Sequence, residues 1–416
     1  MFWYIVLGLV ILLAMVTIHE FGHFIAGKKL GFKINEFSIG FGKSLYTRKM
    51  KDGTDFSVRL VPLGGYCAFE GEEENSENPQ AFNKQAPWKR LIVLFSGAFF
   101  NFLSAIIFSV ILLCAVGYDI PQINSVEPVT KIVYSSMELK STDTIFAINN
   151  IKIEDTQLLY SSNVFQDYEA GTYQISIYRE GENGTKYIYN VDVTTEQSQN
   201  SSLMAGDIIY AVNGKKIDFV HDISFTSMLQ DYVKSDEFEL DKTVDLTIKR
   251  NGIELILENV NLFESGLKNE DGNYSYQLGI TMNAYKHTFG EALLRAIPFT
   301  FGLAWKILVV LFQLITGQLA LSAIGGPITT ITTIATFTQS NFANLFVLLP
   351  LIAANLAVFN WLPFPALDGS KMVFTTIEWI RGKPIKQEVE NTIHTVGLII
   401  LFALVIIADF YQIFLA

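Results

Sequence analysis

The sequence His19-Glu20-Phe21-Gly22-His23, inside the apolar stretch Phe2–Ala26, decides how this chain is interpreted. On a helix, positions i and i+4 share one face about 6 Å apart, so both imidazoles can reach one metal ion. Glu20 flanks that face, where a carboxylate can take a proton from water at the metal. Inserting a charged residue at the centre of a membrane helix costs about 2.5–3.5 kcal/mol of free energy. We therefore expect the two histidines and the glutamate to have a function. The alternative is a pair of interfacial histidines at a helix end.

The composition is that of a membrane protein. Of the 416 residues, 50% are hydrophobic and 17% are charged, whereas soluble domains carry nearer 25% charged residues. Long apolar runs lie at both ends, and the region from about 118 to 285 is polar and acidic. The net charge of −11 argues against nucleic acid as a partner.

Four segments are long and apolar enough to span a bilayer, which takes about 20 residues. They are Phe2–Ala26, Leu91–Val116, Leu345–Leu367 and Thr395–Ala416. The first has no basic residues before it and no small-residue cleavage site, so we interpret it as a retained helix rather than a signal peptide. A fifth stretch, Ala292–Leu321, is ambiguous between an interfacial and an embedded helix.

Basic residues near the helix ends predict the orientation. They are concentrated in the loop Gly27–Arg90 and in the short loop before the last span, so we expect both loops to be cytoplasmic. The polar middle region is then extracytoplasmic, and the histidine pair lies toward the cytoplasmic side. The predicted partner of the apolar segments is the lipid bilayer of a cell membrane, which the chain crosses several times.

Catalytic zinc usually takes three protein ligands and a water molecule, so a third ligand is needed. His221 and His287 lie on the outer side in this topology, too far from the pair. Asp368 follows the third span, where Pro363 and Pro365 break the helix. Irregular backbone at membrane depth is tolerated where it is buried in protein or lines a watery cavity. We therefore predict Asp368 as the third ligand; taken alone, Asp-Gly would indicate only a turn.

The depth of Asp368 also constrains Ala292–Leu321. The span that ends before Asp368 must enter from outside, and the polar middle region is also outside. The connecting segment therefore crosses an even number of times. We predict no crossing, a helix on the outer surface or partly embedded, and four spans in total.

The polar middle region contains an internal repeat. LKSTDTIFAINNIKI begins at Leu139, and LMAGDIIYAVNGKKI begins 64 residues later at Leu203. An alternating apolar strand followed by Asn-Asn or Asn-Gly predicts a hairpin. Two small β-rich domains in tandem fit best; the alternative is one larger β domain.

Another β-like stretch lies between Gly31 and Gly71, with a turn signal at Lys51-Asp52-Gly53-Thr54. Because it directly follows the first helix, we expect this hairpin against or within the membrane face. It could pair with an extended substrate segment, or it could simply cap the helices.

Taken together, HEFGH in the first helix and Leu367-Asp368-Gly369 after a Pro-x-Pro break resemble the site-2 protease family. The similarity is to the bacterial branch of the regulator of sigma-E or sigma-W protease type. Further resemblance lies in FSIGFG, VPLGGYCAFEGE, AFNKQAPWKRLIVLFSGAFFNF, GGPI at Gly325–Ile328 and NLAVFNWLPFPALDG at Asn355–Gly369. The polar middle region resembles the tandem PDZ domains of that branch.

This resemblance implies a zinc-dependent intramembrane endopeptidase that cuts transmembrane segments of membrane proteins, such as anti-sigma factors or signal-peptide remnants. It implies Zn²⁺ as cofactor, His19, His23 and Asp368 as its ligands, and Glu20 as general base. Residues matching the positions associated with substrate are Asn355, Asn360, Pro363 and Pro365. The implied source is a bacterial membrane.

Three departures from the family pattern stand out. The Ala-Gly-Pro before the second helix's Asn101 is Ser96-Gly97-Ala98 here, and the last residue of LDGG is Ser370. The first repeat has Ser141-Thr142-Asp143 in place of Ala-Gly-Asp, which weakens the expectation of a peptide groove there. None of the three changes a predicted metal ligand.

The predicted fold class is an α-helical membrane protein with about four transmembrane helices, a cytoplasmic-side membrane-associated β-hairpin and a two-copy extracytoplasmic PDZ-like region. The domains are 1–117 and 286–416 for the two parts of the membrane core, and 118–198 and 199–285 for the PDZ-like copies. Two other classes compete: an inactive membrane scaffold, and a transporter, which predicts repeated helical halves. The intact His/Glu/His/Asp set favours the protease.

Overall fold

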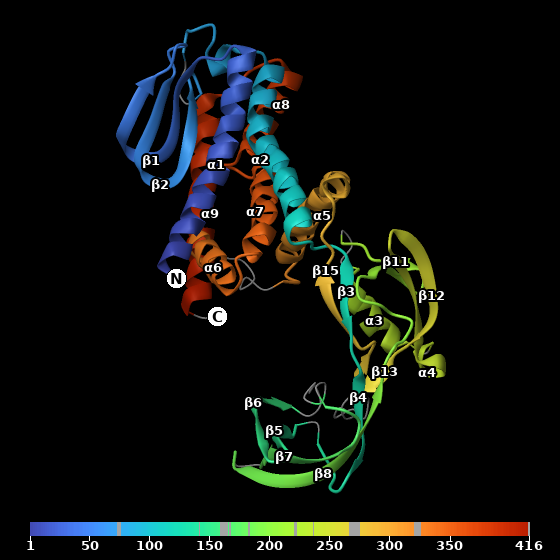
Figure 1. Cartoon of the computed structure of the whole chain (residues 1–416). Coiled ribbons are helices and arrows are strands. Elements are labelled where there is room, and N and C mark those ends of the chain that lie inside the picture. The colour runs from blue at the N-terminus through green and yellow to red at the C-terminus, as the bar shows by residue number, and fades with distance from the viewer. Residues whose placement is uncertain are drawn as a thin grey trace. The chain divides into compact units, whose positions relative to one another are not determined.

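The computed structural model describes most of the chain (Figure 1). The described residues are 1–72, 76–140, 142–158, 165, 168–181, 184–219, 223–235, 237–265, 275–319 and 326–414. Ser141, His221 and Gly325, which the sequence analysis singled out, lie outside these ranges.

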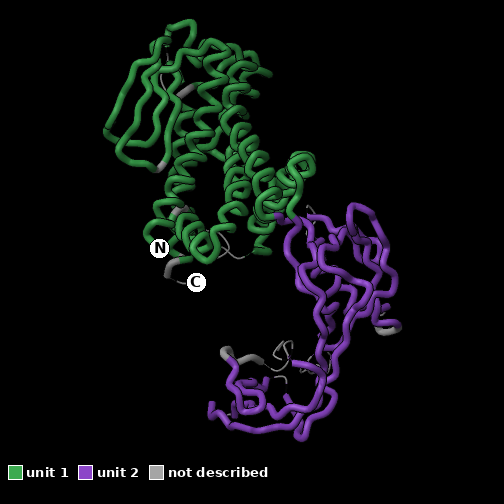
Figure 2. Tube along the Cα trace, in the orientation of Figure 1, with its two compact units in different colours: residues 1–116, 286–416 green, residues 117–285 purple. Residues whose placement is uncertain are grey.

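Two units make up the chain (Figure 2). Unit 1 joins Met1–Val116 to Lys286–Ala416, and unit 2 is Gly117–Tyr285. Unit 1 is mainly helical apart from one hairpin, and unit 2 is β-rich. This agrees with a membrane protein that carries separate β-rich regions.

Unit 1 brings together helices from both ends of the chain. Its helices are α1 (Phe2–Leu30), η1 (Phe82–Lys84), α2 (Pro87–Ala115), α5 (Phe289–Ile315), α6 (Pro327–Ser340), α7 (Asn344–Trp361), α8 (Asp368–Arg381) and α9 (Gln387–Phe414). Five helices of the described chain are long and apolar enough to cross a membrane: α1, α2, α5, α7 and α9. The chain is therefore a multi-pass membrane protein.

Glycine allows α1 and α2 to approach closely. A side chain at Gly22 would collide with the backbone of Ser96 and come within 3.0 Å of Gly97 Cα. Proline at the first position of α2 needs no hydrogen-bond partner there, which suits a helix start. The two helices meet at the turn of α1 that carries His19 and His23, so the histidine pair faces α2.

The predicted hairpin is present as β1 (Ile34–Lys49) and β2 (Asp55–Phe69), which pair antiparallel around the predicted turn. Its base is anchored by a phenylalanine-rich core shared with α1 and η1, made by Phe24, Phe32, Phe37, Phe69 and Phe82. Inside the hairpin, Glu36 accepts hydrogen bonds from Arg59 at 2.7 Å and from Tyr66 at 2.7 Å. These contacts join the two strands of the hairpin.

Helix α7 ends at Trp361, as the two prolines predict, because a residue before proline disfavours helical backbone. Leu362 is extended, and α8 begins at Asp368. Two ion pairs then tie α8 to the first part of the chain: Lys371 with Glu72, at 2.7 Å, and Glu378 with Arg90. The Glu72 carboxylate raises the pKa of Lys371, so the lysine stays charged. The two loops predicted to share a side therefore contact each other.

Unit 2 contains two larger sheets. One has the order β4-β8-β7-β5-β6, and the other has the order β12-β11-β9-β3-β15, with β10 paired to β9. The first comprises β4 (Val129–Ser135), β5 (Thr144–Ile148), β6 (Ile151–Leu158), β7 (Thr172–Glu180) and β8 (Lys186–Ser198). The second comprises β3 (Pro121–Val126), β9 (Ile208–Val212), β10 (Lys215–Lys216), β11 (Thr243–Arg250), β12 (Ile253–Asn261) and β15 (Ile280–Ala284). The remaining elements are β13 (Phe263–Ser265), β14 (Ser275–Gln277), α3 (Phe225–Val233) and α4 (Phe238–Asp241).

The repeat is structural as well as sequential. In each copy a buried aspartate, Asp143 or Asp207, binds an arginine from a later strand, Arg179 or Arg250, through both carboxylate oxygens. Each aspartate also accepts a hydrogen bond from the backbone N–H of the residue three positions before it, which closes the turn before the repeated strand. Two sheets, each with its own apolar core, therefore favour two β domains over one.

One strand differs from the prediction. The sequence assigns residues 118–198 to the first copy, but β3 pairs with β15 and touches β9, both in the second sheet. The first copy is thus inserted between β3 and β9. The pairing partner of β3 lies more than 150 residues away along the chain, and local sequence patterns carry no information about such pairing.

Candidate metal centre

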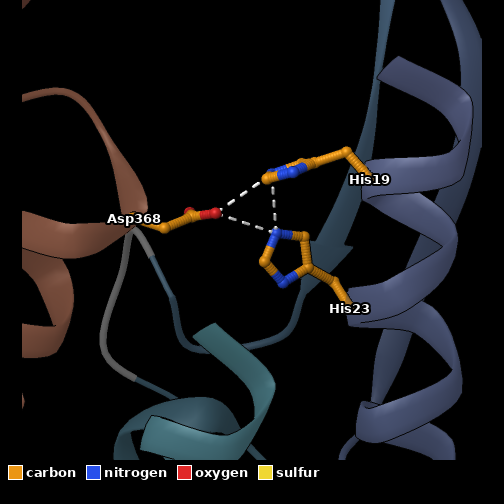
Figure 3. Close-up of side chains that lie close together, drawn as sticks. All are labelled: His19, His23 and Asp368. Atoms are coloured by element: carbon orange, nitrogen blue, oxygen red, sulfur yellow. Dashed lines mark hydrogen bonds and ion pairs between the residues drawn. The ribbon is translucent and has the colours of Figure 1, made fainter. Parts of the chain in front are cut away.

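Three ligand atoms meet where α1, α2 and α8 come together (Figure 3). His19 Nε2 lies 3.1 Å from His23 Nε2. Asp368 Oδ2 lies 3.0 Å from His19 Nε2 and 3.1 Å from His23 Nε2. Helical spacing on α1 puts the histidines on one face, and the start of α8 places the carboxylate opposite them. The structure brings together the three predicted ligands.

This triangle fits a zinc ion. Four-coordinate zinc holds nitrogen and oxygen ligands at about 2.0–2.2 Å, which places ligand atoms about 3.3 Å from one another. Asp368 Oδ2 is buried and has no hydrogen-bond partner among the described residues. A buried carboxylate oxygen that faces two imidazole nitrogens needs a cation or protons to be stable. The donor set, two imidazoles and one carboxylate, is a common one for catalytic zinc.

The Nδ1 atom of each imidazole, which points away from the proposed metal, contacts a residue of α2. His23 Nδ1 lies 2.8 Å from the carbonyl oxygen of Val93, and a proton on Nδ1 leaves Nε2 free as a ligand. His19 Nδ1 lies 3.4 Å from Nδ2 of Asn101, whose Oδ1 has no hydrogen-bond partner among the described residues. A half-turn of this amide would place Oδ1 where it can accept from His19 Nδ1–H, the tautomer that leaves Nε2 free as a ligand. Asn101 therefore orients His19.

Two glycines leave room for this arrangement. A side chain at Gly97 would collide with the His23 ring and come within 2.8 Å of the His19 ring. A side chain at Gly369, beside the third ligand, would collide with the carbonyl oxygen of Leu362. Both glycines are required by space rather than by backbone conformation.

Glu20 lies on the side of the site that faces the hairpin. Its Cγ is 3.7 Å from the position that a Cβ on Gly65 would take. Gly65 belongs to β2, and its own backbone is close to that of Ser38 on β1. The carboxylate interacts electrostatically with His19, His23 and Asp368. A carboxylate between the three predicted ligands and a strand is well placed to serve as a general base beside that strand.

The four predicted substrate residues lie on α7 and the loop after it. Asn355 is exposed on α7, and the Asn360 amide donates to the carbonyl of Leu356 at 2.9 Å. Pro363 is exposed, and Pro365 packs against α9 at Gly397. All four precede Asp368 in the segment that delivers the third ligand. A role in substrate binding stays a prediction.

Sequence reasoning did not assign roles to two polar residues that the structure places near the site. Asn101 contacts His19, and His394 on α9 contacts the backbone before Asp368. Asn101 gives a signal in the sequence, because it is a polar side chain inside an apolar helix, where such groups are costly and functional. His394 lies in the more polar first turns of α9, just before the predicted span Thr395–Ala416, so no such signal marks it in the sequence.

A protein-family model, peptidase family M50, matches residues 7–404. The chain belongs to this family. It is 26% identical to the regulator of sigma E protease of Haemophilus influenzae, over 95% of both chains. It is 26% identical to the regulator of sigma-E protease of Escherichia coli K12, over 98% of both. A protein of Clostridium perfringens named as a zinc metalloprotease is 25% identical over 97% of this chain and 96% of its own.

The family confirms the predicted resemblance and the prediction of a metallopeptidase with zinc as its cofactor. As an M50 peptidase, the chain carries its histidine pair on an apolar helix of a multi-pass membrane protein.

Replacing Asn101 with leucine removes the partner of His19 Nδ1 while keeping the side-chain size. We expect zinc affinity to fall about 10–100-fold, the usual effect of losing such an outer hydrogen bond. Competition with a chelating dye on the purified protein measures this. Ser104→Ala, one turn along α2, is the matched control and should leave zinc affinity unchanged. Equal affinity in Asn101→Leu and the parent would contradict the orienting role.

Proposed function

We propose that the chain is a zinc-dependent intramembrane endopeptidase that cuts transmembrane segments of membrane proteins. The observation that carries this proposal is the convergence of His19, His23 and Asp368 beside Glu20 on membrane helices. The complete set also disfavours an inactive scaffold, because a scaffold has no need of two imidazoles and a carboxylate that converge within 3.1 Å. A transporter is disfavoured by the family.

The chemistry is divided among the residues. Zinc, when bound, supplies a Lewis acid that polarises a peptide carbonyl and lowers the pKa of water. His19, His23 and Asp368 hold it. Glu20 accepts the proton of the attacking water and then passes that proton to the leaving amine. The surrounding helices limit the access of bulk water, which strengthens each electrostatic interaction at the site.

A helical substrate hides its peptide bonds, so a transmembrane segment must unwind locally before it is cut. The β1–β2 hairpin, which approaches Glu20 at Gly65, offers an edge on which an extended segment can pair. Asn355, Asn360, Pro363 and Pro365 lie on the other approach and are the proposed substrate-binding residues. The capping role of the hairpin, seen in its contacts with α1 and η1, is compatible with this function.

The substrates are proposed from the relatives. Two of them are named as regulators of sigma E, which favours membrane-bound anti-sigma factors; signal-peptide remnants are a second class of short transmembrane substrate. The proposed location is a bacterial cell membrane. The metal site then lies toward the cytoplasmic side and the β-rich unit outside.

The proposed topology has four spans, with α5 on the outer side. Helix α5 begins beside the end of α2, where Ala292 packs against Leu113. Helix α6 follows, and its N-terminus at Ile328 and Thr329 binds Asp409 near the end of α9. The ends of α2 and α9 are both outer in this topology. Helix α6, at 14 residues, is too short to return across the bilayer.

Unit 2 is proposed to hold two PDZ-like domains that control access of substrates. In this topology it lies outside the membrane while the metal ligands lie toward the cytoplasmic side, so we assign it no catalytic group. It acts as a size filter or binds peptide ends. The second copy is the better candidate for binding, because Ala205-Gly206-Asp207 is intact and β15 is an edge strand on which a peptide could pair.

Glu20→Gln should retain zinc and lose cleavage, because the amide cannot accept the proton. General-base loss typically lowers the rate by about 10²–10⁴-fold. Asp368→Asn should lower both zinc affinity and activity. Zinc content and cleavage of a single-span membrane substrate measure the two effects. Normal proteolysis by Glu20→Gln would refute the assignment of the base.

Labelling tests the topology in a variant that lacks Cys67 and Cys114. A cysteine at Gln318, just after α5, should react with an impermeant thiol reagent from outside only. A cysteine at Lys383, just after α8, is the matched control and should react only after the membrane is opened. Both positions are exposed in the structure. The reverse pattern at Gln318 would mean that α5 crosses the bilayer.

Deleting unit 2 tests the filter. The intact protein should prefer a substrate already trimmed of its outer domain over the full-length one. The deleted protein should cut both, because the bulky outer domain no longer meets an obstacle. Cleavage of both substrates is compared in membranes. If the deleted protein keeps the preference for the trimmed substrate, the filter hypothesis is wrong. If it binds zinc but cuts neither substrate, unit 2 is required for catalysis itself.

A further inference from the structure

The loop that delivers Asp368 has a strained residue. Ala366, two positions before the ligand, has a φ of +84°. A residue with a Cβ rarely adopts this left-handed region, and surrounding contacts must hold it there. The helical ends of α7 at Trp361 and α8 at Asp368 leave only six residues between them. A change of φ at Ala366 would therefore alter the position of the first residue of α8.

Helix α9 provides the contacts that hold this loop. The backbone N–H of Ala366 donates to Nδ1 of His394 at 3.1 Å. One turn later, Gly397 lies against Pro365: a methyl group there would collide with the Pro365 ring and lie 2.8 Å from its carbonyl carbon. The His394 ring packs edge-on against Phe374 of α8, with ring centroids 5.7 Å apart. His394 therefore contacts both the loop before Asp368 and helix α8, which follows that loop.

His394 has no role in the chemistry proposed above. It is absent from the group of ligand atoms that meet at the metal centre. Because Nδ1 accepts a hydrogen bond, the proton of the neutral ring is on Nε2, and the nearest acid, Glu390, is 3.9 Å from that atom. The bond to Ala366 N is thus its one short polar contact among the described residues.

We propose that His394 is a positioning residue for the metal centre. By accepting the Ala366 hydrogen bond it stabilises the left-handed backbone that sets Asp368 Oδ2 opposite the two imidazoles. This proposal rests on the proposed role of Asp368 as a ligand. Catalytic geometry tolerates little displacement, because a shift of about 1 Å in a ligand changes both metal binding and rate.

Three substitutions separate positioning from packing. His394→Phe keeps a ring and removes the acceptor, and His394→Asn offers Oδ1 close to the place of Nδ1. Ala366→Gly removes the strain, since glycine adopts a positive φ readily. We expect His394→Phe to bind zinc about 10–100-fold more weakly, and His394→Asn to keep most of the affinity. Ala366→Gly combined with His394→Phe should recover much of the loss.

The readouts are zinc affinity by chelator competition and cleavage of a single-span substrate, on the full-length protein in detergent. Val396→Phe, at an exposed position of α9, is the matched control and should behave as the parent. Zinc affinity unchanged in His394→Phe would overturn the proposal. So would a loss that neither His394→Asn nor Ala366→Gly restores, because that result indicates helix packing.

Asp368→Asn, measured in parallel, separates this inference from the function on which it rests. Weak zinc binding by Asp368→Asn with normal binding by His394→Phe overturns the role of His394 alone. Normal zinc binding by Asp368→Asn overturns the ligand assignment, and with it the reason for holding the loop.

Discussion

The structure depends on one electrostatic requirement: three lone pairs face one another in a place from which water is largely excluded. Two imidazole nitrogens and a carboxylate oxygen at 3.0–3.1 Å repel one another unless a cation or protons lie between them. Much of unit 1 serves to keep them there. Val93 and Asn101 fix the imidazoles from α2, and the ion pairs of Lys371 and Glu378 hold α8. The glycines at the helix contacts let these elements approach closely enough.

The same requirement explains the break between α7 and α8. If α7 continued as one helix through residue 368, the backbone hydrogen bonds would all be made within the helix. The direction of the Asp368 side chain would then be fixed by its position around the axis of α7. Pro363 and Pro365 end α7 early, so that Asp368 starts a new helix and its carboxylate points back at α1. The irregular backbone is then covered by α9 at His394 and Gly397. Irregular backbone in a membrane protein needs such cover from its neighbours.

Local patterns predicted the elements well. The i, i+4 histidines, the turn at Lys51–Thr54 and the proline break each carry their own signal, and each is found where expected. Asp368 was predicted as the third ligand because zinc chemistry calls for one and the topology excluded His221 and His287, and its carboxylate does lie beside the two imidazoles. What could not be predicted depends on distant pairing. The Asn101–His19 contact requires the crossing of α1 and α2, and the bond from Ala366 to His394 requires a strained φ that sequence patterns do not reveal.

The position of β3 has a consequence for the order in which the protein folds during synthesis. Of the strands in the second sheet, β3 leaves the ribosome first, yet its partner β15 is made after the whole first copy and most of the second. At about 5–20 residues per second, the wait is on the order of ten to thirty seconds. The five strands of the first copy are complete by Ser198 and pair only among themselves, so they can fold during this interval. The second sheet, by contrast, closes only when the chain is ready to turn back toward the membrane. Until then β3 exposes an unpaired edge, and edges of this kind are where newly made chains aggregate or recruit chaperones.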